Sequence, residues 1–198
     1  MNLTGRGPLS LMVALLTGLG LLAGCASPLC TKHLFLFRDT EPKQPTAQLA
    51  LLLTDPSLAN AVLAQPLPPA EPGCQWAPEQ SAYEGEVYRL SMDRIDDKAV
   101  YQGLCLDTLP TYACEVRPGR RRVLVRCDRF GPWGQEKVKQ TVPLTLEAGR
   151  CYFLQPDCAA MKDQGLVLKV EPLPDAYTPQ LRARLVDYKR RYMKGMDQ

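Results

Sequence analysis

Histidine is almost absent from this chain, since His33 is the single one among 198 residues. A Ser–His–Asp triad needs a histidine beside its nucleophile, and one histidine near the N-terminal apolar segment gives such chemistry little support. No two cysteines have the C-x-x-C spacing that zinc sites favour. We therefore expect no enzyme, and neither a metal nor another cofactor.

Two kinds of acidic site stay open at this stage. The carboxylate pair of a glycosidase is defined by its separation in space, which the sequence does not give. Asp93, Asp96 and Asp97 cluster at a predicted turn over residues 95–98. Such acids are typical of a solvated turn, and calcium ligation is the alternative.

A strong excess of one charge is also missing. The 24 Lys and Arg against 21 Asp and Glu give +3, and removal of an N-terminal segment that carries Arg6 leaves +2. This balance argues against nucleic-acid binding, which needs a marked positive excess.

Long hydrophobic runs are missing except at residues 9–24. A transmembrane helix needs ~20 apolar residues, and Thr17 and Gly20 interrupt this run. A basic residue before the run and small residues at its end are typical of a secretory signal peptide. We assign residues 1–24 to that signal.

Leu22-Ala23-Gly24-Cys25 closes the run and resembles the lipobox of bacterial lipoproteins. The resemblance implies cleavage before Cys25 and attachment of lipid, palmitate included, to its sulfur. Residues 25–32 would then be a lipidated N-terminus and short tether. Ala26 stands where many such proteins carry the Asp that retains them in the inner membrane, so the resemblance favours the outer membrane.

The remaining residues, 33–198, predict a single, mainly β domain. Eighteen prolines and fourteen glycines indicate many turns and therefore short strands. Residues 46–54 fit either a buried strand or a helix, and Asp55-Pro56 predicts a short helix over residues 57–65. Pro143 predicts that its strand lies at a sheet edge. Alternation and turn residues predict strands at 33–38, 88–93, 122–127, 142–146, 151–154 and 166–170.

Eight cysteines indicate an oxidising compartment. Lipid on Cys25 leaves seven, so at least one thiol is unpaired. Cys127 is the candidate, because it is in phase with Val123 and Val125 on the apolar face of a strand. The disulfide candidates are two local pairs and one distant pair: Cys105 with Cys114, Cys151 with Cys158, and Cys30 with Cys74.

Two segments resemble the turns of PEGA-type and carboxypeptidase-regulatory-like bacterial surface modules. Val116 to Val125 is similar to their proline-glycine hairpin, and Leu146 to Tyr152 to their alanine-glycine turn before an aromatic strand. The resemblance implies an antiparallel β-sandwich of the immunoglobulin- or transthyretin-like kind, without catalytic residues. The expected fold is this sandwich, braced by disulfides, with one short helix and a C-terminal amphipathic helix.

The C-terminal helix is predicted over about residues 178–194, with Thr178 as its cap. Its apolar stripe contains Leu181, Leu185, Tyr188 and Tyr192. Against the single acid Asp187 its other faces carry six basic residues: Arg182, Arg184, Lys189, Arg190, Arg191 and Lys194. These fit either a solvated face or contact with an anionic surface.

Trp133 lies between two glycine-containing dipeptides in a predicted loop. It either contacts a partner or folds back over the sheet edge. Together these features predict a membrane-anchored envelope lipoprotein, non-catalytic and structural or partner-binding. The alternative is a periplasmic binding module for an anionic glycan or cell-wall polymer.

Overall fold

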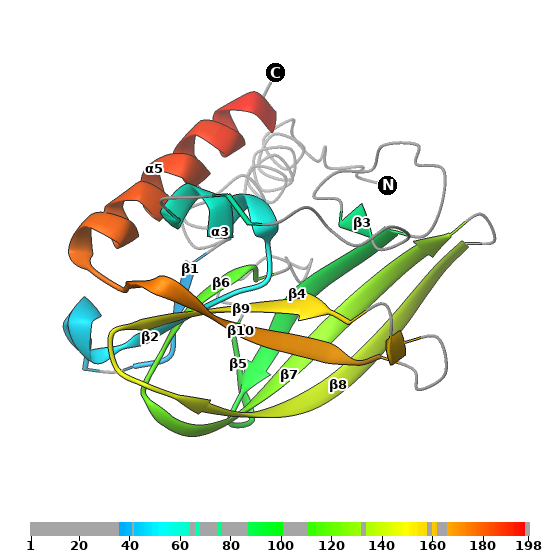
Figure 1. The fold of residues 1–198 in the computed structure, drawn as a ribbon, viewed down its shortest axis with the longest axis horizontal. Coiled ribbons are helices and arrows are strands. Elements are labelled where there is room, and N and C mark those ends of the chain that lie inside the picture. Colours follow the sequence, from blue (N-terminus) through cyan, green and yellow to red (C-terminus); the bar gives the residue numbers. More distant parts are fainter. Residues whose placement is uncertain are drawn as a thin grey trace, which may run out of the picture.

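The computed structural model describes residues 36–40, 42–63, 66–67, 75–76, 87–100, 111–131, 134–157, 160–161 and 166–196. These residues form a mainly β fold with two sheets and two α-helices, and both helices lie on one side of the sheets (Figure 1). The predicted fold class is thus confirmed at the level of a mainly β domain with a short helix and a C-terminal helix.

Sheet A has the strand order β1-β6-β2-β9-β10. Its strands are β1 (Leu36–Arg38), β6 (Ala113–Val116), β2 (Ala50–Leu53), β9 (Arg150–Pro156) and β10 (Leu168–Ala176).

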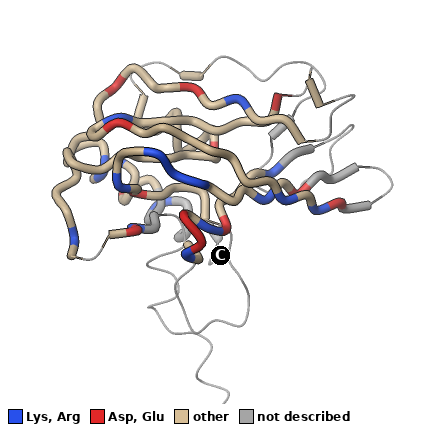
Figure 2. Tube along the Cα trace, turned by 90° about the horizontal axis from the view of Figure 1, so that it is seen from below, with Lys and Arg blue, Asp and Glu red and all other residues tan. Residues whose placement is uncertain are grey.

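Sheet B has the order β3-β4-β7-β8, with β5 paired to β4. Its strands are β3 (Gln75–Trp76), β4 (Val87–Ile95), β7 (Gly119–Gly131), β8 (Gly134–Leu146) and β5 (Lys98–Ala99). β8 ends the path, so the prediction that Pro143 lies on an edge strand is confirmed. Basic residues gather on β7, which carries five arginines and the single acid Asp128. Runs of Lys and Arg are visible as blue stretches of the tube in Figure 2.

The expectation of a purely antiparallel fold is wrong. β1 pairs with β6 in parallel, β2 with β9 in parallel, and β3 with β4 in parallel. Parallel neighbours need a long connection. For β2 and β9 that connection contains all the strands of sheet B. Local sequence patterns therefore do not predict that these two strands pair.

The two turns that carry the family resemblance join different sheets and form no hairpin. Arg117-Pro118 leads from β6 in sheet A to β7 in sheet B, and Glu147 to Gly149 leads from β8 back to β9. Gly149 has a φ of 69°, and a Cβ there would lie 3.3 Å from the carbonyl oxygen of Ala47. Glycine is therefore favoured at this crossing, since a side chain there would be strained and would crowd the Ala47 carbonyl.

One hydrophobic core lies between the two sheets. Alternate residues of both sheets face it, among them Leu52 and Leu154 from sheet A and Leu90 and Val125 from sheet B. The predicted alternation of β4 is confirmed for Leu90 and Met92, whereas Ser91, expected in water, is only 1% exposed.

A second core lies between sheet A and the helices. It joins Leu53 and Phe153 of the sheet to Leu58 of α3 and Leu185 of α5. Strands β2 and β6 of sheet A are thus buried on both faces, and a strand buried in this way is apolar along most of its length. This burial explains the leucine run Ala50–Leu53, whose ambiguity the structure resolves as a 3-10 turn (Thr46–Gln48) followed by strand β2.

Both α-helices begin where the sequence predicts. In α3 (Pro56–Val62), the Asp55 carboxylate accepts hydrogen bonds from Ser57 N–H at 2.7 Å and Leu58 N–H at 3.4 Å. Burial raises the pKa of Asp55 to about 6, although these bonds oppose the rise. α3 ends at Val62, three residues before the predicted end.

In α5 (Pro179–Met196), the Thr178 hydroxyl accepts from the Leu181 N–H at 3.2 Å. In the part of the chain described here, no helix is both long and apolar enough to cross a membrane.

The disulfides predicted at Cys114 and Cys151 are not formed. Both residues are free thiols without solvent exposure. Cys114 faces the core between the sheets and Cys151 the core under the helices, because sheet A has two buried faces instead of the one expected. Cys127 is a reduced, buried thiol beside Val123 and Val125, as predicted. The other candidates, Cys30, Cys74, Cys105 and Cys158, lie outside the described residues.

Candidate functional site

α3 and α5 lie side by side over sheet A (Figure 1). Between them is an open groove of about 640 Å³. α3 contributes its small or polar residues and α5 its long ones: Ser57, Asn60 and Ala61 from α3, and Arg184, Tyr188 and Arg191 from α5.

The groove exists because two helical stripes of unequal side-chain size face each other. Residues at i, i+3 and i+4 share a helix face, which places Ser57 and Ala61 together on α3. The same spacing aligns Arg184, Tyr188 and Arg191 on α5. Short side chains on α3 leave a hollow, and the long side chains of α5 line its other wall.

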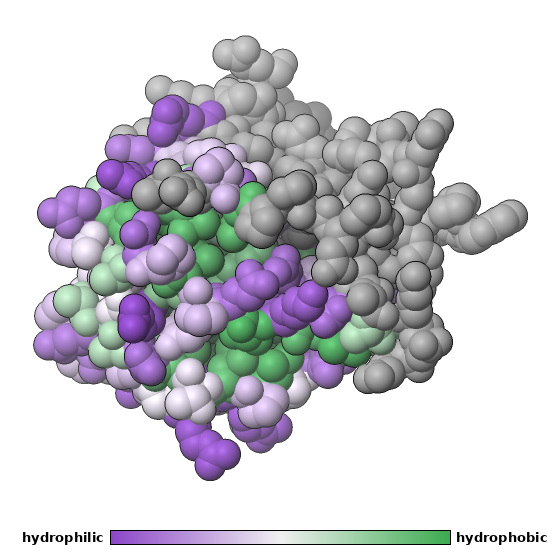
Figure 3. All heavy atoms as spheres, viewed as in Figure 1, coloured by the Kyte–Doolittle hydropathy of each residue, from purple (hydrophilic) through white to green (hydrophobic). Residues whose placement is uncertain are grey.

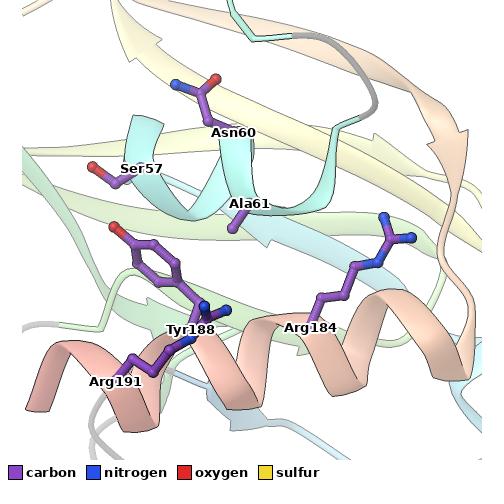
Figure 4. Close-up of a pocket in the computed structure, with 6 residues that line it drawn as sticks. All are labelled: Ser57, Asn60, Ala61, Arg184, Tyr188 and Arg191. Carbon is purple, nitrogen blue, oxygen red and sulfur yellow. The ribbon is translucent and has the colours of Figure 1, made fainter. Parts of the chain in front are cut away.

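The arrangement of these side chains is clear in the close-up (Figure 4). Arg184 extends from α5 toward α3, and Tyr188 rises toward the first turn of α3, on the side where the Ser57 hydroxyl lies. Arg191 lies beside Tyr188. The wall of α5 therefore offers two guanidinium groups and a phenol hydroxyl.

Both groove arginines are exposed. Among the described residues, neither Arg184 nor Arg191 makes an ion pair. By contrast, Arg182 on the same helix binds the Glu115 carboxylate, with Nε 2.9 Å from Oε1. The groove wall therefore carries two arginines, and the acid Asp187 lies on the same helix, three residues after Arg184 and four before Arg191.

Glu115 fixes α5 to sheet A from beneath. Its side chain is 0% exposed and lies on β6. The Arg38 Nε donates to Glu115 Oε2 at 2.6 Å, and the Tyr177 hydroxyl and Arg182 Nε donate to Oε1 at 2.6 and 2.9 Å. One carboxylate thus connects β1, β6, the residue before the Thr178 cap, and α5.

The charges around Glu115 determine its protonation. Burial alone would raise its pKa, but the hydrogen bonds from Arg38 and Tyr177 and the charge of Arg182 hold the pKa below its ordinary value. Burial and the neighbouring carboxylate raise the pKa of Tyr177, which stays a hydrogen-bond donor. Glu115 is therefore an anion matched by two cations.

Sequence reasoning missed Glu115. The available signal was an acid within the apolar segment Ala113–Val116. In a strand with one solvent-exposed face, an acid at such a position is expected to point into water, so it does not indicate burial. Its burial becomes evident only when α5 is known to cover that face.

The predicted basic face of the C-terminal helix is divided between two roles. Arg182 pairs with the buried Glu115, so its charge is already matched, although its side chain is 40% exposed. Arg184 and Arg191 line the groove. The side chains of Lys189, Arg190 and Lys194 lie outside the described residues. Trp133 and Cys25 lie outside them as well.

Two of the three acids that cluster at the predicted turn, Asp93 and Asp96, have basic neighbours. Asp96 Oδ2 lies 2.8 Å from Arg121 Nη1, and Asp93 Oδ2 lies 2.8 Å from Lys139 Nζ. Desolvation would raise the pKa of Asp96, but hydrogen bonds from Arg122 and Arg121 lower it. Within the described ranges, no three His, Cys, Asp or Glu side chains are grouped to hold a metal ion.

Comparison of the chain with protein-family models, curated proteins and solved structures finds no match. A functional assignment therefore depends on the residues and geometry of this chain.

Proposed function

We propose that this protein is a lipid-anchored, non-catalytic component of the bacterial cell envelope that binds a partner. The observation that carries the proposal is the sequence Leu22-Ala23-Gly24-Cys25 at the end of an apolar run. Two or three acyl chains on one cysteine anchor a protein firmly, since each buried methylene contributes ~0.8 kcal/mol. Ala26 stands where inner-membrane lipoproteins often have Asp, so the proposed location is the outer membrane.

The architecture that accompanies this proposal is a β-sandwich module of the PEGA-like or carboxypeptidase-regulatory-like kind. Support comes from the core to which both sheets contribute. On the face seen in Figure 3, apolar side chains form patches bordered by polar ones.

Metabolic labelling tests the anchor. Cells that express the chain are grown with labelled palmitate, and the protein is isolated and fractionated. We expect label on the wild type and none on Cys25→Ser, which should also leave the membrane fraction or accumulate as the uncleaved precursor. Ala26→Ser serves as the matched control and should keep its label. An unlabelled wild type that fractionates like Cys25→Ser contradicts the proposal.

A second candidate is a binding module for an anionic glycan or cell-wall polymer. The groove between α3 and α5 favours it, because Arg184 and Arg191 can bind acidic groups while Tyr188 and Ser57 offer hydroxyls for sugar oxygens. Pull-down with isolated peptidoglycan distinguishes the two. Binding by the wild type that Arg184→Gln and Arg191→Gln abolish together would favour the glycan module.

A further inference from the structure

We infer that the groove between α3 and α5 binds the phosphate groups of anionic membrane lipids. The inference rests on the lipid anchor proposed above and adds a second contact with the bilayer. Its occupants are the head groups of two neighbouring lipids such as phosphatidylglycerol, one phosphate at Arg184 and one at Arg191.

The charge and the size of the groove support this assignment. Two guanidinium groups without an ion pair among the described residues face one hollow, and arginine binds phosphate through charge-assisted hydrogen bonds. The volume of about 640 Å³ lies within the range of small-molecule sites, about 300–1,000 Å³.

The spacing on α5 indicates how the ligand lies. Arg184 and Arg191 are seven residues apart, which is about 10 Å along the helix axis. Each arginine can therefore take a phosphate of its own. Two phosphates at this separation are a property of a lipid surface more than of a single small anion.

The anchor brings the groove to the bilayer. Arg38 on β1 and Arg182 on α5 bind the same Glu115 carboxylate, so the chain joins the folded body beside α5. From Cys25 to Leu36 the chain spans at most about 40 Å. A lipid on Cys25 thus holds β1, and α5 beside it, within about 40 Å of the membrane surface. A negative leaflet attracts basic residues that come within a Debye length of it.

Arginine modification with mass spectrometry tests the inference. The lipidated protein is placed in vesicles of phosphatidylcholine alone or of phosphatidylcholine with about a quarter phosphatidylglycerol, and phenylglyoxal modification is followed at each arginine. We expect Arg184 and Arg191 to react about fivefold more slowly in the anionic vesicles. Arg120 and Arg122, which are exposed on β7 in sheet B, should react equally in both.

Two further results would contradict the inference. Equal protection in both kinds of vesicle would mean that the bilayer merely covers α5. Protection by dissolved glycerol phosphate in detergent, without protection by anionic vesicles, would mean that the groove binds a free phosphate compound.

A pair of matched variants provides a second readout. Anionic vesicles should raise the melting temperature of the wild type and of Arg120→Gln/Arg122→Gln, but not that of Arg184→Gln/Arg191→Gln. Failure of the anchor is read separately, from palmitate labelling. If Cys25 carries no lipid, added anionic vesicles still test the groove; if Cys25 is lipidated and no arginine is protected, only the groove inference fails.

Discussion

At the scale of single residues, Glu115 connects three parts of the fold through one buried carboxylate. It is fully buried and has hydrogen bonds from Arg38, Tyr177 and Arg182. A buried ion pair gives little net stability over an apolar pair of the same shape, but removal of one partner is costly, because the other charges are left without compensation. The role of Glu115 is therefore to specify where α5 and β1 lie.

The substitution Glu115→Gln tests this role. It keeps the size of the side chain but leaves Arg38 and Arg182 facing a neutral amide, and we expect a loss of about 3 kcal/mol in the free energy of unfolding. Urea denaturation measures it. Glu147→Gln is the control, since Glu147 is 71% exposed and pairs with Arg150 at 3.5 Å; it should cost less than about 1 kcal/mol.

The same variant has a pH signature. Because the pKa of Glu115 is lower in the folded protein than its ordinary value of 4.5, its contribution is complete above pH 4.5 and disappears as the pH falls through the folded value. The difference in the free energy of unfolding between wild type and Glu115→Gln should therefore become smaller below pH 4. A difference that stays constant down to pH 2 contradicts the assignment.

At the scale of elements, α5 has three functions on three faces. Leu181 and Leu185 enter the core over sheet A, Arg182 reaches Glu115, and Arg184 and Arg191 border the groove. Helix periodicity predicts the first face correctly. The sequence predicts the other two faces as a single basic surface. The elements packed against α5 distinguish Arg182, which pairs with Glu115, from Arg184 and Arg191 in the groove.

Leu185→Ala tests how far packing holds α5. The side chain is 3% exposed in the core under the helices, and its truncation should cost about 2–4 kcal/mol. Val186→Ala on the neighbouring, partly exposed position should cost less than about 1 kcal/mol. Both are measured by thermal unfolding. Equal effects would mean that α5 is not held by its apolar stripe.

At the scale of the whole molecule, three layers follow one another: sheet B, sheet A and the helices. The central layer is buried on both faces and contains Cys114 and Cys151 on opposite sides. Burial raises the pKa of Cys114 and raises that of Cys151 to about 12, so neither thiol reacts readily in the folded state.

Alkylation kinetics test this arrangement. In the folded protein without reductant, Cys114 and Cys151 should react with iodoacetamide only as fast as the domain unfolds, whereas in denaturant both should react at once. Peptide mass spectrometry assigns each site. A cysteine of this pair that stays unlabelled in denaturant, until a reductant is added, would be in a disulfide and would contradict the structure.

Local sequence patterns predicted several features correctly. Asp55 and Thr178 cap helices, Pro143 marks an edge strand, and Cys127 follows the alternation of its strand into the core. Each depends on residues within a few positions in the chain, or on the period of one element. Such features are visible without knowledge of any neighbour.

The features that the sequence did not predict depend on distant residues. Glu115 is 77 positions from Arg38 and 67 from Arg182, and the walls of the groove come from α3 and α5. The parallel pairing of β2 with β9 is of the same kind.

The sequence by itself therefore determined the mainly β class, the starts of the helices and the core-facing residues of β4 and β7, because propensity and periodicity act between near neighbours. Only the tertiary structure decided which sheet each strand joins, which thiols stay reduced and which arginines remain unpaired among the described residues. Those outcomes depend on burial, and burial is set by the layers that cover a residue from elsewhere in the chain.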